Sequence, residues 1–346
     1  MFRERANMQG AVQNSNIKRN LGLTIAAFAA VYLIWGSTYL GIKIAIETLP
    51  PFMMAGVRFL TAGAILMIWA RLSGDYEKPK ATHWRTSAIV GGFLLLGGNG
   101  AVVFAEHYIS SSLTALLVAT EPFWVVLLIW LWLKGPKPSL KVVSGLAIGF
   151  LGVWLLISGR SVTAATAGDG GNEWFGIVAV MIGAVSWAAG SVYGLKAPAP
   201  RSAIQTAGMQ MLAGGAMLLI TSIVLGDWRS VDLAAISARS IYALIYLILF
   251  GAVLGFTAYS WLLKNANPAI VATYAYVNPV IAVILGWLIL GEGFTGQMLL
   301  GAGVVVGSVA LITSQGKEDS GIVEEDDDLE TPSGAADGRR TASATA

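Results

Sequence analysis

Apolar stretches long enough to cross a bilayer recur along this sequence, separated by short polar or Gly/Pro-rich segments. A helix needs about 20 apolar residues to cross the hydrocarbon layer, which is roughly 30 Å thick. A soluble chain carries about 25% charged residues, whereas this chain carries 12%, together with 55% hydrophobic residues. We therefore predict an all-α integral membrane protein with about ten transmembrane helices. They lie near residues 22–43, 51–70, 87–105, 113–133, 140–158, 174–196, 203–225, 240–263, 269–290 and 297–314.

Positive charges are distributed unevenly among the segments between these helices. If the N-terminus lies in the cytosol, most of the 22 lysine and arginine residues fall on the cytosolic side, for example Arg3, Arg5, Lys78 and Lys80. Cytosolic loops of membrane proteins carry such an excess of Lys and Arg. We therefore predict a multi-pass protein of the cell inner (plasma) membrane with both termini in the cytosol.

The second half of the chain repeats features of the first half in the same order. The segment AGVRFLTAGAILMI (55–68) aligns with AGMQMLAGGAMLLI (207–220), and HYISSSLTALLVATEPFWVV (107–126) aligns with KNANPAIVATYAYVNPVIAV (264–283). Matches in a common order indicate an internal duplication. The chain is therefore divided into a cytosolic tail, a first five-helix repeat, an external linker, a second five-helix repeat and a disordered acidic cytosolic tail. These parts are residues 1–20, 21–158, 159–173, 174–315 and 316–346.

Each predicted repeat contains five helices, so the second repeat has to enter the membrane from the opposite side. This predicts two inverted-topology repeats, an arrangement that is typical of secondary transporters with a binding site between the repeats. A channel or a membrane sensor is the alternative.

Several segments resemble the EamA-type carriers of the drug/metabolite transporter superfamily, in particular the YedA-like subgroup. They are WGSTYL (35–40), PPFMMAGVRFL (50–60), GNG followed by AEH (98–107), SWAAGSVYG (186–194) and YAYVNP (274–279). The resemblance covers residues 22–314 and implies a ten-helix inner-membrane permease that exports amino acids, other metabolites or toxic small molecules. The chain departs from the family pattern after the fourth helix, where Lys134-Gly135 replaces the Gly-Glu pair found at Gly291-Glu292.

One carboxylate, Glu121, lies inside an otherwise apolar predicted helix. A charged side chain at the centre of a membrane helix costs about 3 kcal/mol, and the predicted depth of Arg58 in a second helix is similar. The two charges can form an ion pair that faces the central cavity, or they can jointly hold a zwitterionic or charged substrate. A purely structural ion pair fits the sequence equally well. In the second repeat the aligned positions are Gln210 and Asn278.

Glu121 is also the candidate for coupling transport to a proton gradient. A buried carboxyl can exchange a proton with solvent or substrate, although a nearby arginine favours the ionised form and opposes this role.

Asn99 stands among three glycines inside a predicted helix, within LLLGGNGAVVF (94–104). Glycines at such a position permit a kink that exposes backbone dipoles to a substrate, or close packing against a neighbouring helix. We assign Asn99 to the cavity. Aromatic residues near the middle of other helices suit a cavity wall for apolar or cationic solutes, although ordinary helix packing explains them equally well. They are Trp35, Tyr39, Trp187, Tyr193, Tyr274 and Tyr276.

Two prolines, Pro122 and Pro279, occupy aligned positions in the two repeats. A proline inside a helix removes a backbone hydrogen bond and bends the helix, so both are candidate hinges or static bends.

Enzyme chemistry has little support in this sequence. The chain has two histidines and no cysteine, and it lacks a phosphate-binding GxxxxGK[ST] loop. We predict no catalytic residues, no metal, no cofactor and no nucleic-acid partner. The prediction is a secondary-active exporter of small organic metabolites, such as amino acids, that works by alternating access in the lipid bilayer. Export of amphiphilic or cationic toxic compounds is the alternative, the proton is a candidate coupling ion, and a homo-oligomer is compatible with the sequence.

Overall fold

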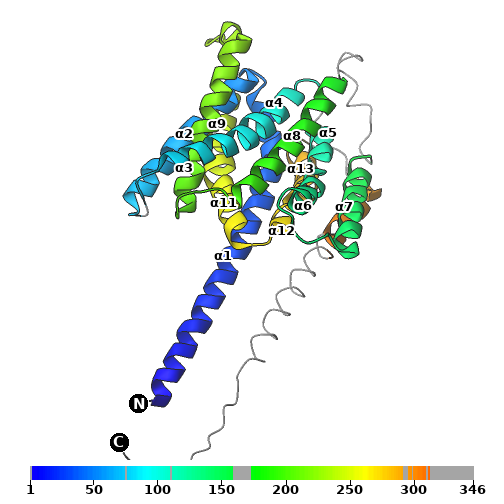
Figure 1. Cartoon of the computed structure of the whole chain (residues 1–346). Helices are drawn as coiled ribbons and strands as arrows, with labels where there is room; N and C mark the ends of the chain where they lie inside the picture. Colours follow the sequence, from blue (N-terminus) through cyan, green and yellow to red (C-terminus); the bar gives the residue numbers. More distant parts are fainter. Residues whose placement is uncertain are drawn as a thin grey trace, which may run out of the picture.

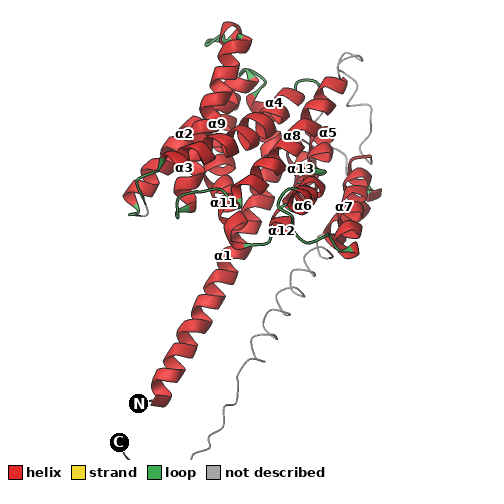
Figure 2. Cartoon of the chain, in the orientation of Figure 1, coloured by secondary structure: helices red, strands yellow, loops and turns green. Residues whose placement is uncertain are grey.

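The computed structural model of this chain describes residues 2–74, 76–109, 111–158, 173–290, 295–297, 299–308 and 311. Within them the regular structure is entirely helical, as Figure 2 shows. The helices are α1 (Phe2–Ala45), α2 (Pro51–Leu72), α3 (Ala81–Gly91), η1 (Gly92–Asn99), α4 (Gly100–Ala105), α5 (Ser111–Val118), α6 (Glu121–Leu131), α7 (Leu140–Ser158), α8 (Glu173–Gly194), α9 (Ala203–Leu225), η3 (Asp227–Ser230), α10 (Ala238–Tyr246), η4 (Leu247–Leu254), α11 (Gly255–Asn265), α12 (Pro268–Val271) and α13 (Tyr274–Leu290).

The predicted all-helical structure is confirmed for the described residues and is consistent with a membrane protein. Six helical segments are long and apolar enough to cross a membrane: Leu21–Ala45, Pro51–Leu72, Ala81–Ala105, Trp174–Gly194, Ala203–Leu225 and Ala238–Asn265. Four shorter apolar helices coincide with the other predicted spans: Glu121–Leu131, Leu140–Leu155, Tyr274–Ile289 and Leu299–Ser308. The total of ten transmembrane helices therefore stays a prediction.

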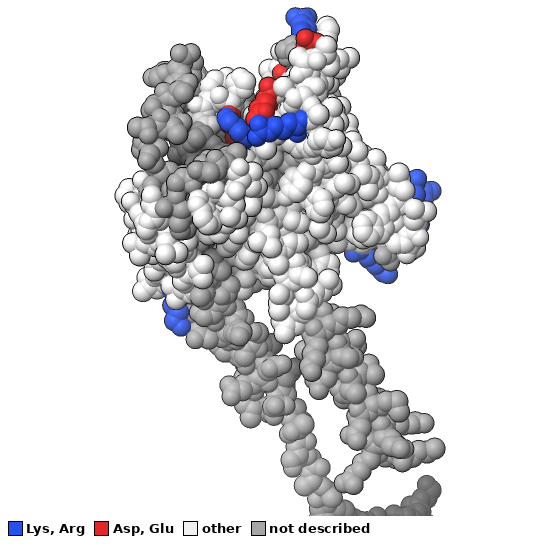
Figure 3. All heavy atoms as spheres, turned by 180° about the vertical axis from the view of Figure 1, so that it is seen from behind, with Lys and Arg blue, Asp and Glu red and all other residues white. Residues whose placement is uncertain are grey.

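The arrangement of the bundle and its charges agrees with a membrane setting. In Figure 1 the helices pack side by side, and the N-terminal part of α1 extends away from the bundle. On the face drawn in Figure 3 the described charges form small separate groups in the upper part, at the right and at the lower left, with a broad uncharged area between them. Most of the predicted linker, the Gly291-Glu292 pair and the predicted acidic tail lie outside the described residues.

The predicted span over residues 113–133 is divided into two helices, α5 and α6, so the chain breaks where a bend at Pro122 was predicted. The division falls at Ala119 and Thr120, directly before Glu121 and Pro122. A proline clashes with the carbonyl of the residue four positions earlier and cannot donate a backbone hydrogen bond. The Thr120 hydroxyl donates to the carbonyl of Leu117 at 2.7 Å, which satisfies one of the acceptors that the end of α5 leaves free.

The corresponding helix of the second half is divided in the same manner. α12 ends at Val271 and α13 begins at Tyr274, and the Thr273 hydroxyl donates to the carbonyl of Ile270 at 2.6 Å. The predicted helix over residues 269–290 is thus also discontinuous. Helix ends inside a membrane protein expose backbone dipoles, so they occur where the chain lines a cavity or is buried in protein.

Two other helices contain a wider π-helical stretch at their centres, namely η1 between α3 and α4, and η4 between α10 and α11. The glycine-rich segment around Asn99 therefore forms a π-helix instead of a simple kink. Close packing is present too, because a Cβ atom on Gly91 would lie 2.4 Å from the carbonyl oxygen of Gln210. π-Helical stretches are rare and are frequently found at functional sites.

Helices α2 and α9 form an extensive antiparallel contact across the centre of the molecule. A Cβ atom on Gly56, near the start of α2, would lie 2.7 Å from Leu219, near the end of α9. A Cβ atom on Gly63, further along α2, would lie 2.9 Å from the carbonyl oxygen of Gly208, near the start of α9. Small residues allow helix backbones to approach this closely in membranes.

Candidate functional site

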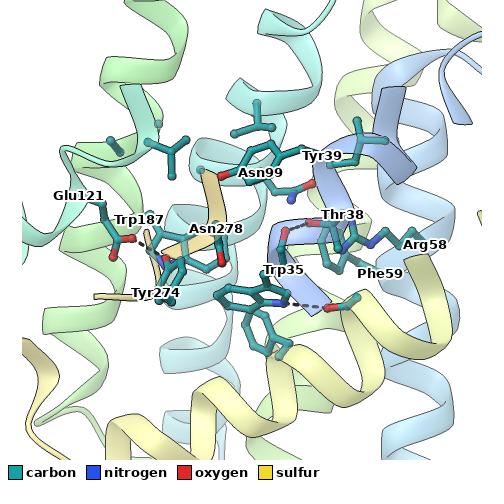
Figure 4. Close-up of a pocket in the computed structure, with 18 residues that line it drawn as sticks. Trp35, Thr38, Tyr39, Arg58, Phe59, Asn99, Glu121, Trp187, Tyr274 and Asn278 are labelled. Atoms are coloured by element: carbon teal, nitrogen blue, oxygen red, sulfur yellow. Dashed lines mark hydrogen bonds between the residues drawn. The ribbon is translucent and has the colours of Figure 1, made fainter. Parts of the chain in front are cut away.

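A cavity lies between the two halves of the chain, where the π-helices and the helix breaks meet. The space between its lining atoms, counted together with the open solvent at its mouth, is about 670 Å³. Figure 4 shows its lining residues. They are Trp35, Thr38, Tyr39, Ile42, Arg58, Phe59, Gly98, Asn99, Val102, Val118, Glu121, Gly183, Ala184, Trp187, Gly251, Phe256, Tyr274 and Asn278.

Helix α1 contributes one face to this cavity. Trp35, Thr38, Tyr39 and Ile42 line it, at the spacing that places residues on one side of a helix. The indole Nε1 of Trp35 donates a hydrogen bond of 3.0 Å to the carbonyl of Gly251 in η4. This bond joins α1 to the π-helical wall and fixes the indole ring at the cavity.

Arg58 lies on α2 at one end of the cavity and is 3% exposed. Its Nε donates to the carbonyl of Leu247 in η4 at 3.2 Å, and its guanidinium carbon is 4.7 Å from the centroid of the Phe59 ring. The η4 backbone approaches Arg58 at Gly251, where a Cβ atom would lie 2.9 Å from a guanidinium nitrogen. The other terminal nitrogen, NH1, has no hydrogen-bond partner among the described residues.

Glu121 is the first residue of α6 and is 1% exposed. Its Oε2 accepts a hydrogen bond of 2.5 Å from the Tyr274 hydroxyl, which comes from the first residue of α13. Its Oε1 has no hydrogen-bond partner in the part of the chain that the structure describes. A carboxylate at a helix N-terminus is favoured by the helix dipole, so the break before α6 provides a place for this charge.

The predicted direct ion pair between Arg58 and Glu121 is not formed in this structure, which describes both side chains. Figure 4 shows the two residues at opposite ends of the lining, with Asn278 and Trp35 between them. Arg58 is held by the η4 backbone and Glu121 by Tyr274. The second predicted arrangement, in which the two charges hold a substrate together, remains a hypothesis.

Four cavity residues carry a buried polar atom without a hydrogen-bond partner among the described residues. These atoms are NH1 of Arg58, Oδ1 of Asn99, Oε1 of Glu121 and Oδ1 of Asn278. Most buried polar atoms in native proteins are hydrogen-bonded. A group of unsatisfied donors and acceptors that line one cavity therefore marks a site for a polar ligand.

Aromatic rings form the apolar wall of the cavity, with Trp35 at their centre. The ring centroid of Trp35 lies 5.5 Å from that of Trp187, 5.0 Å from Tyr259 and 4.9 Å from Tyr274. The Tyr259 hydroxyl accepts a bond of 3.1 Å from Trp187 Nε1 and lies 2.6 Å from the Ser191 hydroxyl. Aromatic pairs at such distances stabilise one another, so the wall is rigid.

Three residues that the sequence assigned to the cavity lie elsewhere. Gln210 is buried in α9, where its backbone packs against Gly91. The Tyr193 ring lies 6.3 Å from the Trp132 ring, and Tyr276 donates to the carbonyl of Leu146 at 3.2 Å. These corrections share one reason, because sequence gives the depth of a residue in the membrane but not which side of its helix faces the centre.

The two predicted hinge prolines occupy different positions in their helices. Pro122 is the second residue of α6, where its missing N–H group leaves no bond unmade, whereas Pro279 lies inside α13. The hinge role of either residue stays a prediction.

Several cavity residues were missed by the sequence analysis. Thr38 is one helical turn from Trp35, and Phe256 aligns with Asn99 in the internal repeat. The helical spacing and the alignment could both have been used. They were not, because a threonine or phenylalanine in an apolar helix does not by itself indicate a binding residue. Tyr259 is 2% exposed and supports the aromatic wall.

Comparison with known proteins identifies the class. Residues 22–158 and 174–314 each match the EamA-like transporter family. These two matches span most of the chain, so the protein belongs to this family of membrane transporters.

Two proteins of similar sequence are named as transporters, and one solved structure has a similar fold. The chain is 40% identical over 296 residues to the Escherichia coli (strain K12) protein called "Uncharacterized inner membrane transporter YedA", covering 85% of this chain and 92% of that protein. It is 28% identical to the Bacillus subtilis (strain 168) protein called "Uncharacterized transporter YvbV", over 85% of this chain and 92% of that protein. A solved crystal structure with 19% identity has a TM-score of 0.67, covering 86% of this chain and 99% of that one, and supports the fold.

Proposed function

We propose that this protein is a secondary-active transporter that exports small zwitterionic metabolites, such as amino acids or related compounds, by alternating access. One observation carries the proposal. A carboxylate and a guanidinium, those of Glu121 and Arg58, lie at opposite ends of one apolar cavity, and each has a polar atom without a hydrogen-bond partner among the described residues. A zwitterion carries the complementary charges at a fixed separation.

Each part of the cavity has a role in this proposal. The Arg58 guanidinium binds the carboxylate of the substrate, because an N–H to carboxylate bond is charge-assisted. Glu121 accepts the ammonium group, and the amides of Asn99 and Asn278 supply further donors and acceptors. Trp35 and the rings around it contact the apolar part of the substrate.

The inverted repeat is part of the same proposal. Equivalent segments of the two halves lie in α2 and α9, and the contacts of Gly56 and Gly63 support an antiparallel arrangement. Both halves also contain a central π-helix and a divided helix. Two similar halves that run in opposite directions supply two states of similar energy, each open to one side of the membrane.

The orientation in the membrane is inferred from charge. The excess of Lys and Arg in alternate loops supports cytosolic termini and an external linker at residues 159–173. The name of the E. coli relative supports the inner membrane as the location. Glu121 remains the candidate residue for exchange of a coupling proton, and a homo-oligomer stays a prediction.

A second candidate substrate class is favoured by one detail of the site. Arg58 already donates to Leu247 and lies against Phe59, whereas Glu121 faces an aromatic wall. A cavity that uses only the acid and the rings suits an amphiphilic or cationic toxic compound.

Flux in proteoliposomes tests both substrate classes. The purified protein is reconstituted, and uptake of individual radiolabelled amino acids is compared with uptake of a cationic dye. Arg58→Gln and Glu121→Gln are assayed beside Arg71→Gln, a control in the last turn of the same helix. A zwitterion carrier loses flux in both cavity variants, and a cation carrier loses it only in Glu121→Gln. Absence of flux for every compound contradicts the transport proposal and favours a sensor.

A further inference from the structure

A second buried carboxyl group, Glu106, lies close to the cavity but outside its lining. Glu106 directly follows α4, and Asn99, Val102 and Glu106 are spaced for one helical face. Asn99 and Val102 line the cavity. Glu106 is 1% exposed, and neither carboxylate oxygen has a hydrogen-bond partner among the described residues. This face of the helix therefore continues from the cavity to an acid without a partner.

The ammonium group of Lys43 contacts the backbone of Glu106 and not its carboxylate. The Lys43 ammonium, at the end of α1, donates to the backbone carbonyl of Glu106 at 3.1 Å instead of to its carboxylate. Tyr39, one turn earlier on the same face of α1, lines the cavity. Helices α2 and α8 also pack against α4. Among the described residues, Lys43 is the charged group that acts on Glu106.

An acid in such a place binds protons near neutral pH. Burial disfavours the ionised carboxylate and raises the pKa of Glu106 to about 8, although Lys43 opposes the rise. Glu106 directly follows the apolar span Ala81–Ala105, so it lies at one end of that span. Glu121 accepts a hydrogen bond from Tyr274, whereas neither oxygen of Glu106 has a hydrogen-bond partner in the described part of the chain.

We propose that Glu106 is the entry site for a coupling proton, and that Tyr39 links it to the substrate-binding carboxylate of Glu121. A hydronium ion from the aqueous phase gives one proton to the Glu106 carboxylate and becomes water, and this proton forms the O–H bond of the Glu106 carboxyl. That bond then breaks as the proton moves to the Tyr39 oxygen, while the Tyr39 hydroxyl gives its own proton to the Glu121 carboxylate. Tyr39 is therefore unchanged, and Glu106 is ionised again. The proposal deepens the transport function and rests on it.

The first experiment detects the proton without any transported solute. Infrared spectra of the reconstituted protein are recorded across a pH series, and the band of protonated carboxyl groups is compared with that of Glu106→Gln. Glu47→Gln is the matched control, because Glu47 is a half-exposed carboxylate 3.6 Å from Arg239. We expect the wild type and the control to lose one component of the band around pH 8, and Glu106→Gln to lack that component. A band identical in all three proteins overturns the proposal.

The second experiment separates proton entry from substrate binding. The radiolabelled amino acid with the largest flux is used. Its uptake into proteoliposomes is measured once with an imposed pH gradient and once as exchange without a gradient, and the first value is divided by the second. We expect this ratio to fall to unity in Glu106→Gln and to keep its wild-type value in Glu47→Gln. A wild-type ratio in Glu106→Gln overturns the proposal. If no amino acid is transported at all, the transport function fails, while the infrared result still reports the proton at Glu106.

Discussion

Helix α2 takes part in two regions of opposite character, the antiparallel contact with α9 and the cavity. At the contact, Gly56 and Gly63 allow α9 to approach until no side chain fits between the backbones. In the cavity, Arg58 of the same helix keeps a terminal nitrogen unpartnered among the described residues. The contact consists of closely packed backbones and apolar side chains, whereas the cavity contains polar atoms without hydrogen-bond partners among the described residues. Stability and recognition are therefore assigned to different faces of one helix.

The largest effect is expected at the packed contact. Gly63→Ala places a Cβ atom 2.9 Å from the carbonyl oxygen of Gly208 and from the backbone nitrogen of Leu212, neither of which can rotate away. Overpacking of this kind costs about 1–3 kcal/mol, so we expect a lower melting temperature in detergent and lower yield. Gly22→Ala is the control, because a Cβ atom there meets nothing within 4 Å. Equal melting temperatures for both variants would contradict the close contact.

Substitution of Glu121, the carboxylate of the cavity, should lower substrate affinity without lowering stability. Glu121→Gln removes a buried carboxylate whose Oε1 has no partner among the described residues, so we expect the melting temperature to be kept. Loss of a charge-assisted contact of about 2–3 kcal/mol lowers substrate affinity by roughly 30-fold to 150-fold. Binding of the transported amino acid to the purified protein, measured by calorimetry, checks this. Unfolding of the variant, or unchanged affinity, would place Glu121 with the structural residues instead.

The pH dependence of stability tests whether Glu106 is a buried acid without a partner among the described residues. Its pKa is raised from 4.5 to about 8 by burial in the folded protein, so the folded state binds more protons than the unfolded state between these values. The free energy of unfolding therefore falls as pH rises from 4.5 to about 8. We expect the melting temperature to decrease over this range and the decrease to be smaller in Glu106→Gln. The exposed-site variant Glu47→Gln should decrease like the wild type, and an equal decrease in Glu106→Gln would be evidence against a buried protonated carboxyl.

The smallest effect is expected at the aromatic wall. Trp35→Phe keeps a ring in the cavity but removes the hydrogen bond of 3.0 Å to Gly251. Such a bond contributes about 1 kcal/mol, and we expect roughly a fivefold loss of substrate affinity. Trp69→Phe, at a residue 52% exposed on α2, should leave affinity unchanged. A loss in both variants would show that the effect does not come from the cavity.

Part of the cavity was predictable from single residues. Arg58, Glu121 and Asn99 are polar groups in apolar helices, and each lines the cavity. The prediction did not find the helix break before Glu121, although the following Pro122 was a local signal for it. It also did not select Glu106, because this residue lies at the end of a predicted helix, and helix ends are usually exposed. Burial of Glu106 depends on how α4 packs against α1, α2 and α8, which no local pattern contains.

The sequence by itself determined the all-helical membrane class and the order of the repeated segments, because the length of an apolar stretch is a local property. It also limited the polar residues available at depth. Only the tertiary structure decided that Arg58 and Glu121 lie apart across the cavity, that Gln210 packs against α3, and that Tyr259 joins the aromatic wall. The physical reason is that these outcomes depend on the rotation of each helix about its own axis. That rotation is set by contacts between segments far apart in the chain.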